Sequence, residues 1–147
     1  MPPYVRPFVW HLPYPLAWDL FIKNAQFFIG RYDYSSFCAS DSSAKSKVRE
    51  VYDVVVEERG PLVDFWISGE GFLKQMIRAI VGTLVEIAGQ KKAFPAIPDL
   101  IKARDRTLAG QTAPALGLSL VRVCYDGVPS LQHLIRRGDT GFSYPIF

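Results

Sequence analysis

The chain has 147 residues, 49% of them hydrophobic and 21% charged, with a formal net charge of +3 at pH 7. This length fits one domain with a buried core, and the composition is that of an ordinary globular protein. The mild positive charge permits a nucleic-acid partner without requiring one. No apolar run reaches the roughly 18 residues that a membrane span needs, and no signal peptide is visible at Met1, so we expect a soluble cytoplasmic protein without a membrane partner.

The first third of the chain predicts a short strand and a helix. Residues 8–12 favour a strand, which the surrounding prolines restrict to a sheet edge. Pro15 opens a helical pattern that Gly30 closes. Residues 31–39 are an irregular aromatic stretch, and residues 40–47 a polar loop.

Two strands are expected next. Residues 48–58 are dense in β-branched side chains, and residues 62–68 alternate, with Val63, Phe65 and Ile67 on one face. Only Arg59-Gly60-Pro61 separates the two runs. Such a short break between strands predicts an antiparallel hairpin.

The clearest periodicity of the chain predicts a helix over residues 72–88. Its apolar side chains recur at three- and four-residue spacing, and Gly89 stands where a helix usually ends. Beside the apolar face run Lys74, Arg78 and Gly82, each four residues after the last. Like charges one helical turn apart oppose helix formation slightly, so this flank makes more sense if an anionic group lies against it.

The rest of the chain predicts a short helix at residues 97–104, a loop of small residues at 108–117 and a final strand at 118–125. The tail, residues 126–147, has weak periodicity and is assigned no structure. The order is close to βαββαβ. We therefore expect an α+β fold, with helices packed on one face of an antiparallel sheet and the other face free for a ligand.

The cysteines and histidines argue against several kinds of site. Cys38 and Cys124 are far apart and lack metal-type spacing, so we expect buried thiols and no disulfide framework, which favours a reducing cytoplasm. His11 and His133 belong to no cluster of carboxylates or cysteines, so no metal site is expected. A nucleophile–histidine–acid triad has no support in the sequence either.

Arg78 is the most interesting single residue. A lone arginine on a helix flank is usually solvated, but in this apolar stretch its guanidinium could meet a buried carboxylate or a phosphate bidentately. Other basic residues recur at the ends of predicted elements, where they form either a solvated surface or a patch that tracks a phosphate backbone. Those assigned to RNA binding are Lys74, Arg49, Arg104 and Arg106.

Two long blocks carry a resemblance to a known family: GEGFLKQMIRAIVGTLVEI at residues 69–87 and ARDRTLAGQTAPALGLSLVRV at residues 103–123. Both resemble the C-terminal half of the tRNA pseudouridine synthase A family. Supporting matches are VWHLP at residues 9–13 and GRYDYSSF at residues 30–37. The resemblance covers residues 8–125 in order, without a large gap.

The resemblance implies an isomerase without a cofactor, which converts uridine to pseudouridine in the anticodon stem-loop of tRNA. The target base would be flipped out of its stack, and an aspartate would attack covalently so that the base can be re-attached through carbon. Arg78 matches the arginine that orients this aspartate. Leu118, just after Gly117, would pack against the uracil ring, and Thr112 would help to wall the pocket. The family works as a homodimer whose basic clefts hold the tRNA.

The family's nucleophilic aspartate and active-site tyrosine belong to its N-terminal half, and neither is found at its expected place. Residues 137–142 faintly resemble the nucleophile motif but come too late in the chain, so Asp139 is interpreted as part of a polar turn. Residues 1–125 are therefore expected to form the C-terminal-half domain, followed by the tail. Two functions stay open: the tRNA-binding, active-site-supporting half of a synthase, inactive without its N-terminal half, or a non-catalytic RNA-binding or dimerisation module.

Overall fold

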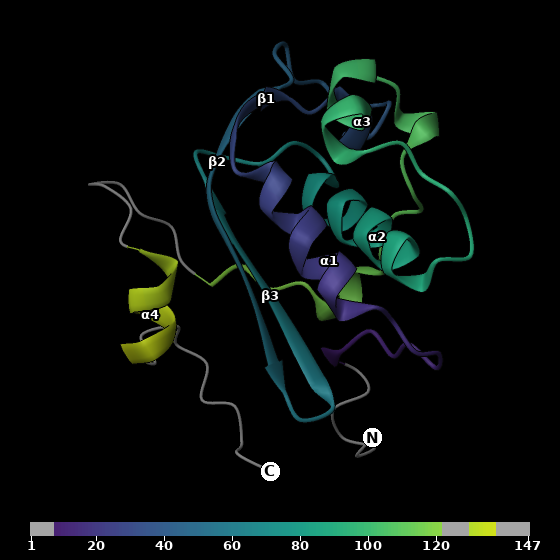
Figure 1. Cartoon of the computed structure of the whole chain (residues 1–147). Helices are drawn as coiled ribbons and strands as arrows, with labels where there is room; N and C mark the ends of the chain where they lie inside the picture. Colours follow the sequence, from purple (N-terminus) through teal and green to yellow (C-terminus); the bar gives the residue numbers. More distant parts are fainter. Residues whose placement is uncertain (1–7, 122–129, 138–147) are drawn as a thin grey trace.

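A computed structural model describes residues 8–121 and 130–137 of the chain (Figure 1). Within them, one antiparallel sheet has the strand order β1-β2-β3. The strands are β1 (Gly30–Asp33), β2 (Val48–Arg59) and β3 (Leu62–Gly69). The α-helices are α1 (Trp18–Ala25), α2 (Met76–Gly89), α3 (Ile97–Ala103) and α4 (Leu131–Arg137). Single 3₁₀ turns are η2 (Gln26–Phe28), η3 (Ser35–Phe37), η4 (Arg106–Leu108) and η5 (Ala115–Gly117). The α+β class expected from the sequence is confirmed.

The β2–β3 hairpin forms as the sequence predicts. Its pairing runs from Arg59 opposite Leu62 to Val51 opposite Gly69, with an irregularity in register between Val51 and Asp53. Gly60 supplies the turn with a φ of +58°, a conformation that glycine adopts without a steric penalty. The long pairing makes this hairpin the frame on which the helices pack.

The core lies between the hairpin and the helices α1, α2 and α3. Phe65 and Ile67 of β3, two of the three residues predicted to share one face of this strand, pack against it. The amide of Ala17 donates to the carbonyl of Ala88 over 2.9 Å and so ties the start of α1 to the end of α2. Fully buried large side chains include Tyr34, Phe28, Phe37, Met76, Ile80, Leu84, Ile97 and Leu100.

The first strand is not where the sequence places it. Residues 8–12 lie outside the sheet. Strand β1 begins instead at Gly30, which was expected to close the preceding helix, and continues into residues 31–39, the stretch expected to be irregular. Its residues Gly30 to Asp33 pair with Val51 to Val48 of β2. Gly-Arg-Tyr-Asp carries no β-branched alternation, so pairing with a neighbouring strand, not intrinsic preference, makes it a strand.

Helix α2 is shorter than its periodicity predicts. It begins at Met76 instead of Phe72, because Gln75 adopts a left-handed φ of 61° and breaks the helical path. At the other end Gly89 belongs to the helix, and Gln90, with a φ of 56°, takes the left-handed capping conformation. Leu73, although outside the helix, is buried as its apolar spacing predicts.

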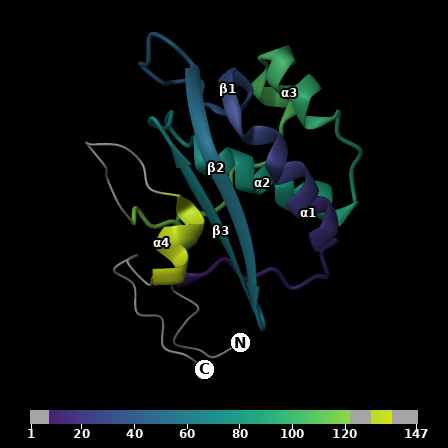
Figure 2. The same ribbon diagram turned by 60° about the vertical axis from the view of Figure 1, so that its left-hand side comes forward.

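The opposite side of the hairpin is not fully open. Helix α4, from the tail that was assigned no structure, contacts β2 and β3 and lies across the hairpin from α1 and α2 in both views (Figure 1 and Figure 2). The expectation of a face free for a ligand fails where α4 lies. Of the expected strand at 118–125, Leu118 to Val121 lie outside the sheet and the remainder is outside the described residues.

Cys38 is a buried free thiol, as predicted, whereas Cys124 and Asp139 lie outside the described residues. None of the helices in the described part of the chain has the length and apolar character to cross a bilayer. Among the same residues, no three potential metal-binding side chains of His, Cys, Asp or Glu come together.

Candidate active-site support

A loop of residues 109–113 crosses α2 and is held to it by hydrogen bonds. The Gly110 amide donates to Thr83 Oγ1 over 2.9 Å, and Thr83 Oγ1 donates in turn to the Ala79 carbonyl over 2.8 Å. Further along, the Ala113 amide donates to the Arg78 carbonyl over 2.9 Å. This 109–113 loop therefore runs along successive turns of α2.

Two glycines allow the loop to come this close. A Cβ atom added at Gly82 would overlap the carbonyl oxygen of Gln111. A Cβ added at Gly110 would lie 2.8 Å from the Cα of Thr83. Because real Cβ atoms do not approach backbone to such distances, both positions need glycine for the two backbones to touch. Gly82, which follows Lys74 and Arg78 at four-residue spacing, is thus where the loop contacts the helix backbone.

Arg78 is half-buried beside this loop. Its Nε donates to the carbonyl of Ala113 over 2.7 Å, and its own carbonyl accepts from the Ala113 amide. The two residues are therefore linked in both directions. Among the described residues, no carboxylate forms an ion pair with Arg78. One edge of the guanidinium is held by the protein's own backbone, which fixes the direction in which the group points.

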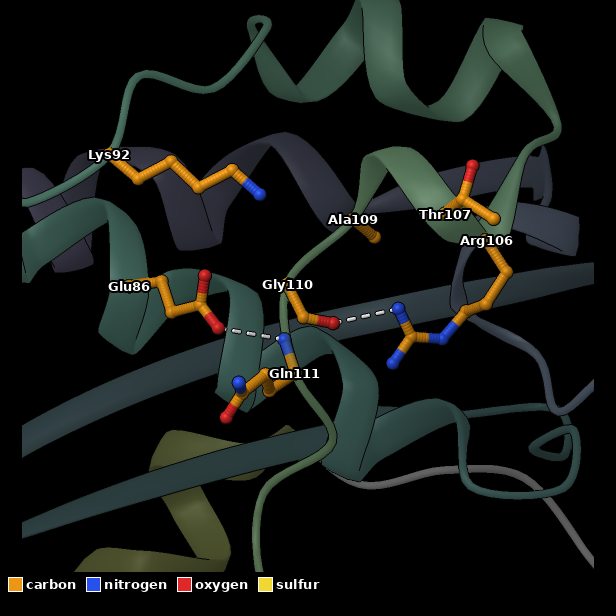
Figure 3. Close-up of a pocket in the computed structure, with 7 residues that line it drawn as sticks. All are labelled: Glu86, Lys92, Arg106, Thr107, Ala109, Gly110 and Gln111. Carbon is orange, nitrogen blue, oxygen red and sulfur yellow. Dashed lines mark hydrogen bonds between the residues drawn. The ribbon is translucent and has the colours of Figure 1, made fainter.

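Arg106 braces the same loop from the other side. Its Nη1 donates to the Gly110 carbonyl over 2.7 Å and its Nη2 to Thr112 Oγ1 over 3.0 Å. Glu86 of α2 accepts the Gln111 amide at Oε1 over 2.8 Å. Figure 3 shows Arg106 and Glu86 reaching toward the Gly110–Gln111 segment from opposite sides. A shallow pocket of about 400 Å³ opens beside them and is lined by Glu86, Lys92, Arg106, Thr107, Ala109, Gly110 and Gln111.

The remaining residues assigned to substrate binding lie just beyond the loop. Thr112 is within it and accepts the bond from Arg106. Gly117 ends η5, where an added Cβ would lie 3.4 Å from the amide nitrogen of Trp10. Leu118 follows with 49% of its surface exposed. The fold thus brings Arg78 and Arg106 to the same loop, which contains Thr112. Leu118 follows a short distance along the same chain segment.

The other residues assigned to RNA binding lie apart and have partners within the chain. Lys74 Nζ pairs with Asp41 over 2.7 Å, and Arg104 Nε lies 3.6 Å from the carboxylate of Asp33. Arg49 donates to the carbonyls of Ser46 and Val48. They occupy the ends of separate elements, so whether they form one phosphate-binding surface stays a prediction.

These contacts lower the pKa of the two carboxyl groups that face the cations, Asp33 and Asp41. The hydrogen bond from Lys74 and its charge lower the pKa of Asp41. Burial alone would raise the pKa of Asp33, but hydrogen bonds from the Ser35 hydroxyl and amide, with the charge of Arg104, lower it overall. Both carboxyl groups therefore ionise at a lower pH than an ordinary aspartate.

The sequence reasoning missed Thr83 and Glu86. Both lie on the α2 face that continues from Arg78 and Gly82, and Glu86 follows Gly82 by four residues. The four-residue spacing was a usable signal, but only the path of the loop shows that this face carries backbone contacts instead of solvent.

Comparison with known proteins decides the family. The family model for tRNA pseudouridine synthase matches residues 25–126, which is more than half of the chain and includes α2 and the 109–113 loop. The chain belongs to this family. The resemblance proposed from residues 69–87 and 103–123 is therefore confirmed.

Individual relatives agree with the pseudouridine synthase assignment. The tRNA pseudouridine synthase A of Thermoanaerobacter sp. strain X514 is 41% identical over 123 residues, covering 84% of this chain and 50% of the relative. That of Acetivibrio thermocellus is 44% identical over 116 residues, covering 79% and 48%. That of Geobacillus kaustophilus is 45% identical over 118 residues, covering 80% and 45%. The chain spans about half the length of the curated relatives it matches.

Proposed function

We propose that this chain is the active-site-supporting, tRNA-binding half of a tRNA pseudouridine synthase and does not complete the reaction alone. The observation that carries the proposal is Arg78, which is half-buried and held by the Ala113 carbonyl. No carboxylate among the described residues pairs with it. An arginine fixed along one edge is suited to receive an acidic group supplied from outside the described residues.

In this proposal the acidic group is a nucleophilic aspartate. It belongs to the half of the relatives that this chain does not match. The aspartate attacks C1′ of the target nucleotide, and the bond between C1′ and N1 of uracil breaks. The base turns, its C5 bonds to C1′, and the bond between C1′ and the aspartate breaks, which restores the free carboxylate. The proton of C5 leaves to solvent and N1 gains one, so uridine and pseudouridine remain isomers and no cofactor is needed. Arg78 keeps the aspartate ionised and correctly directed through the sequence of steps.

The substrate contacts follow the same segment. Leu118, after Gly117, would pack on the flipped uracil, and Thr112 would form part of the wall. Lys74, Arg49, Arg104 and Arg106 are assigned to the tRNA surface near the anticodon stem-loop, in a cytoplasmic homodimer with basic clefts. Each of these assignments is part of the proposal.

Release of tritium from tRNA labelled at C5 of uridine tests the catalytic part, because formation of the new carbon–carbon bond expels that hydrogen. We expect the isolated chain to release tritium at background level, although a full-length relative releases it with turnover. Release by the isolated chain at a rate near that of the relative would contradict the proposal. In the relative, replacing the arginine aligned with Arg78 by alanine is expected to abolish most turnover, and unchanged turnover would remove the role of Arg78.

A tRNA titration at several salt concentrations tests the binding part. Binding that weakens steeply with salt is expected, since each lysine or arginine on a phosphate releases counterions. Absence of binding at low salt would overturn the assignment of a tRNA surface to this chain. The alternative function, a non-catalytic RNA-binding or dimerisation module, would be favoured if tRNA binds but removal of the aligned arginine leaves the relative's turnover unchanged.

A further inference from the structure

The Gly110–Gln111 peptide group is held at both of its polar atoms by charged side chains. Its carbonyl oxygen accepts from Arg106 Nη1 over 2.7 Å, and its N–H donates to Glu86 Oε1 over 2.8 Å. One side chain is cationic and the other anionic, and each meets the end of the peptide dipole that it favours. Turning this peptide over would place the carbonyl against Glu86 and the N–H against Arg106, so both charges lock its orientation.

The consequence of this lock reaches Arg78 through the loop. Once the 110–111 peptide is oriented, the next carbonyl, that of Gln111, lies against Gly82. Arg106 Nη2 then holds Thr112 at its hydroxyl over 3.0 Å. The following residue is Ala113, whose carbonyl accepts from Arg78 Nε over 2.7 Å. Only Gln111 and Thr112 separate the 110–111 peptide bond from Ala113. Turning that peptide over would therefore move the Ala113 carbonyl, which accepts the hydrogen bond that directs the Arg78 guanidinium.

We infer that Arg106 and Glu86 are positioning residues for Arg78, acting through the 109–113 loop. This inference rests on the proposed function for the catalytic meaning of Arg78, but the positioning itself is a property of the chain. It assigns to Glu86 a role that no motif indicated. It also offers Arg106 a role other than the RNA contact expected of it.

The opposite charges of the two residues make the inference testable. If they acted on tRNA as surface charges, Arg106→Ala would weaken tRNA binding and Glu86→Ala would strengthen it. If both residues position Arg78, the two substitutions should shift the Arg78 Nε–H resonance in the same direction. A probe on Arg78 itself therefore separates positioning from general electrostatics.

The experiment is NMR of the full 147-residue chain with ¹⁵N-labelled arginine and backbone, well below its unfolding temperature. In Arg106→Ala and in Glu86→Ala we expect the Arg78 Nε–H resonance to move toward that of a solvated arginine. Protection of the Gln111 and Ala113 amides from hydrogen exchange should fall by about tenfold or more. Because the two residues hold one peptide, the double variant should lose little more than either single variant.

Conservative variants and matched controls complete the design. Arg106→Lys keeps the charge but not the planar fork that reaches Gly110 and Thr112 together, so its Arg78 signal should stay shifted. Glu86→Gln keeps an acceptor oxygen and should restore part of the protection of the Gln111 amide. Arg136→Ala and Glu58→Ala, which remove the same charges at exposed positions elsewhere, should leave the Arg78 signal as in the unmodified chain.

The inference is overturned if the Arg78 resonance and the two amides are unchanged in both alanine variants. It is equally overturned if the controls shift the Arg78 resonance as much as Arg106→Ala does. Should Arg106→Ala not fold, Arg106→Lys and Glu86→Gln carry the same comparison. Failure of the proposed function would look different, since tRNA binding or the aligned-arginine experiment would fail while the Arg78 probe still responded to Arg106 and Glu86.

Discussion

Gly82 lies where the 109–113 loop crosses α2, and it shows how one missing side chain can determine a site. In a helix interior, alanine is normally more stable than glycine by about 1 kcal/mol. At this position the added methyl group meets the Gln111 carbonyl, and the Ala113 amide nitrogen at 3.0 Å. The usual preference is therefore reversed by contact with a segment almost thirty residues later in the chain.

We predict that Gly82→Ala destabilises the chain by about 1–3 kcal/mol, because the loop must move off the helix. Urea unfolding measures this change. Gly89→Ala is the matched control, since Gly89 lies in the same helix and its added Cβ would meet only Leu16 Cδ2, at 3.8 Å. That control should be neutral or stabilising. Equal stability of the two variants would show that the loop does not need the bare backbone at Gly82.

The carboxylate of Asp33, at the end of β1, contacts residues of η3 and the residue that follows α3. It accepts from the hydroxyl and amide of Ser35 and lies near Arg104. Because these contacts lower the pKa of Asp33 in the folded chain, the ionised group stabilises the fold above its unfolded pKa. That stabilisation is lost as the pH falls through the lower, folded pKa.

We therefore predict that Asp33→Asn destabilises the chain at pH 7 and that this difference shrinks toward pH 3. Unfolding by urea at both pH values checks the prediction. Asp99→Asn, an exposed acid in the first turn of α3, serves as a control for general loss of negative charge. A difference between unmodified chain and Asp33→Asn that stays constant with pH would contradict the assigned cause.

At the scale of elements, α2 shows which features periodicity captures. The apolar spacing correctly predicts that Leu73, Met76 and Ile80 are buried. It does not predict the ends, because these depend on Gln75 and Gln90, each in a left-handed conformation that glutamine rarely adopts. Gly89 was the natural candidate for the cap, but the helix includes it and turns one residue later.

We predict that Gln90→Gly stabilises the chain by about 0.5–1 kcal/mol, since glycine takes this conformation without a Cβ penalty, a gain partly offset by its freer unfolded state. Thermal unfolding gives the measurement. Gln90→Ala removes the same polar side chain but keeps the Cβ, so it should bring no gain. A stabilisation by alanine equal to that by glycine would mean that the backbone conformation is not the cause.

At the scale of the whole molecule, the sheet separates two kinds of environment. Helices α1 and α2 cover one side of the β2–β3 hairpin, and α4 lies against the other (Figure 2). The family match ends at residue 126, so α4 follows the matched region. Trp66 alternates with the inward-facing Phe65 and Ile67, and its buried indole nitrogen has no hydrogen-bond partner among the described residues.

The family, the hairpin and the buried face of α2 could be predicted from the sequence, because these depend on local pattern and on two long motif blocks. The ends of α2 could not be predicted, because they depend on the left-handed conformations of Gln75 and Gln90. Nor could β1 or the hydrogen bonds that hold the 109–113 loop. Strand β1 and the path of the loop depend on contacts between residues far apart in the chain, such as Gly82 with Gln111 and Glu86 with the amide of Gln111. Local preferences are weak compared with such contacts, so only the tertiary structure decides where the backbone turns and which groups hold Arg78 in place.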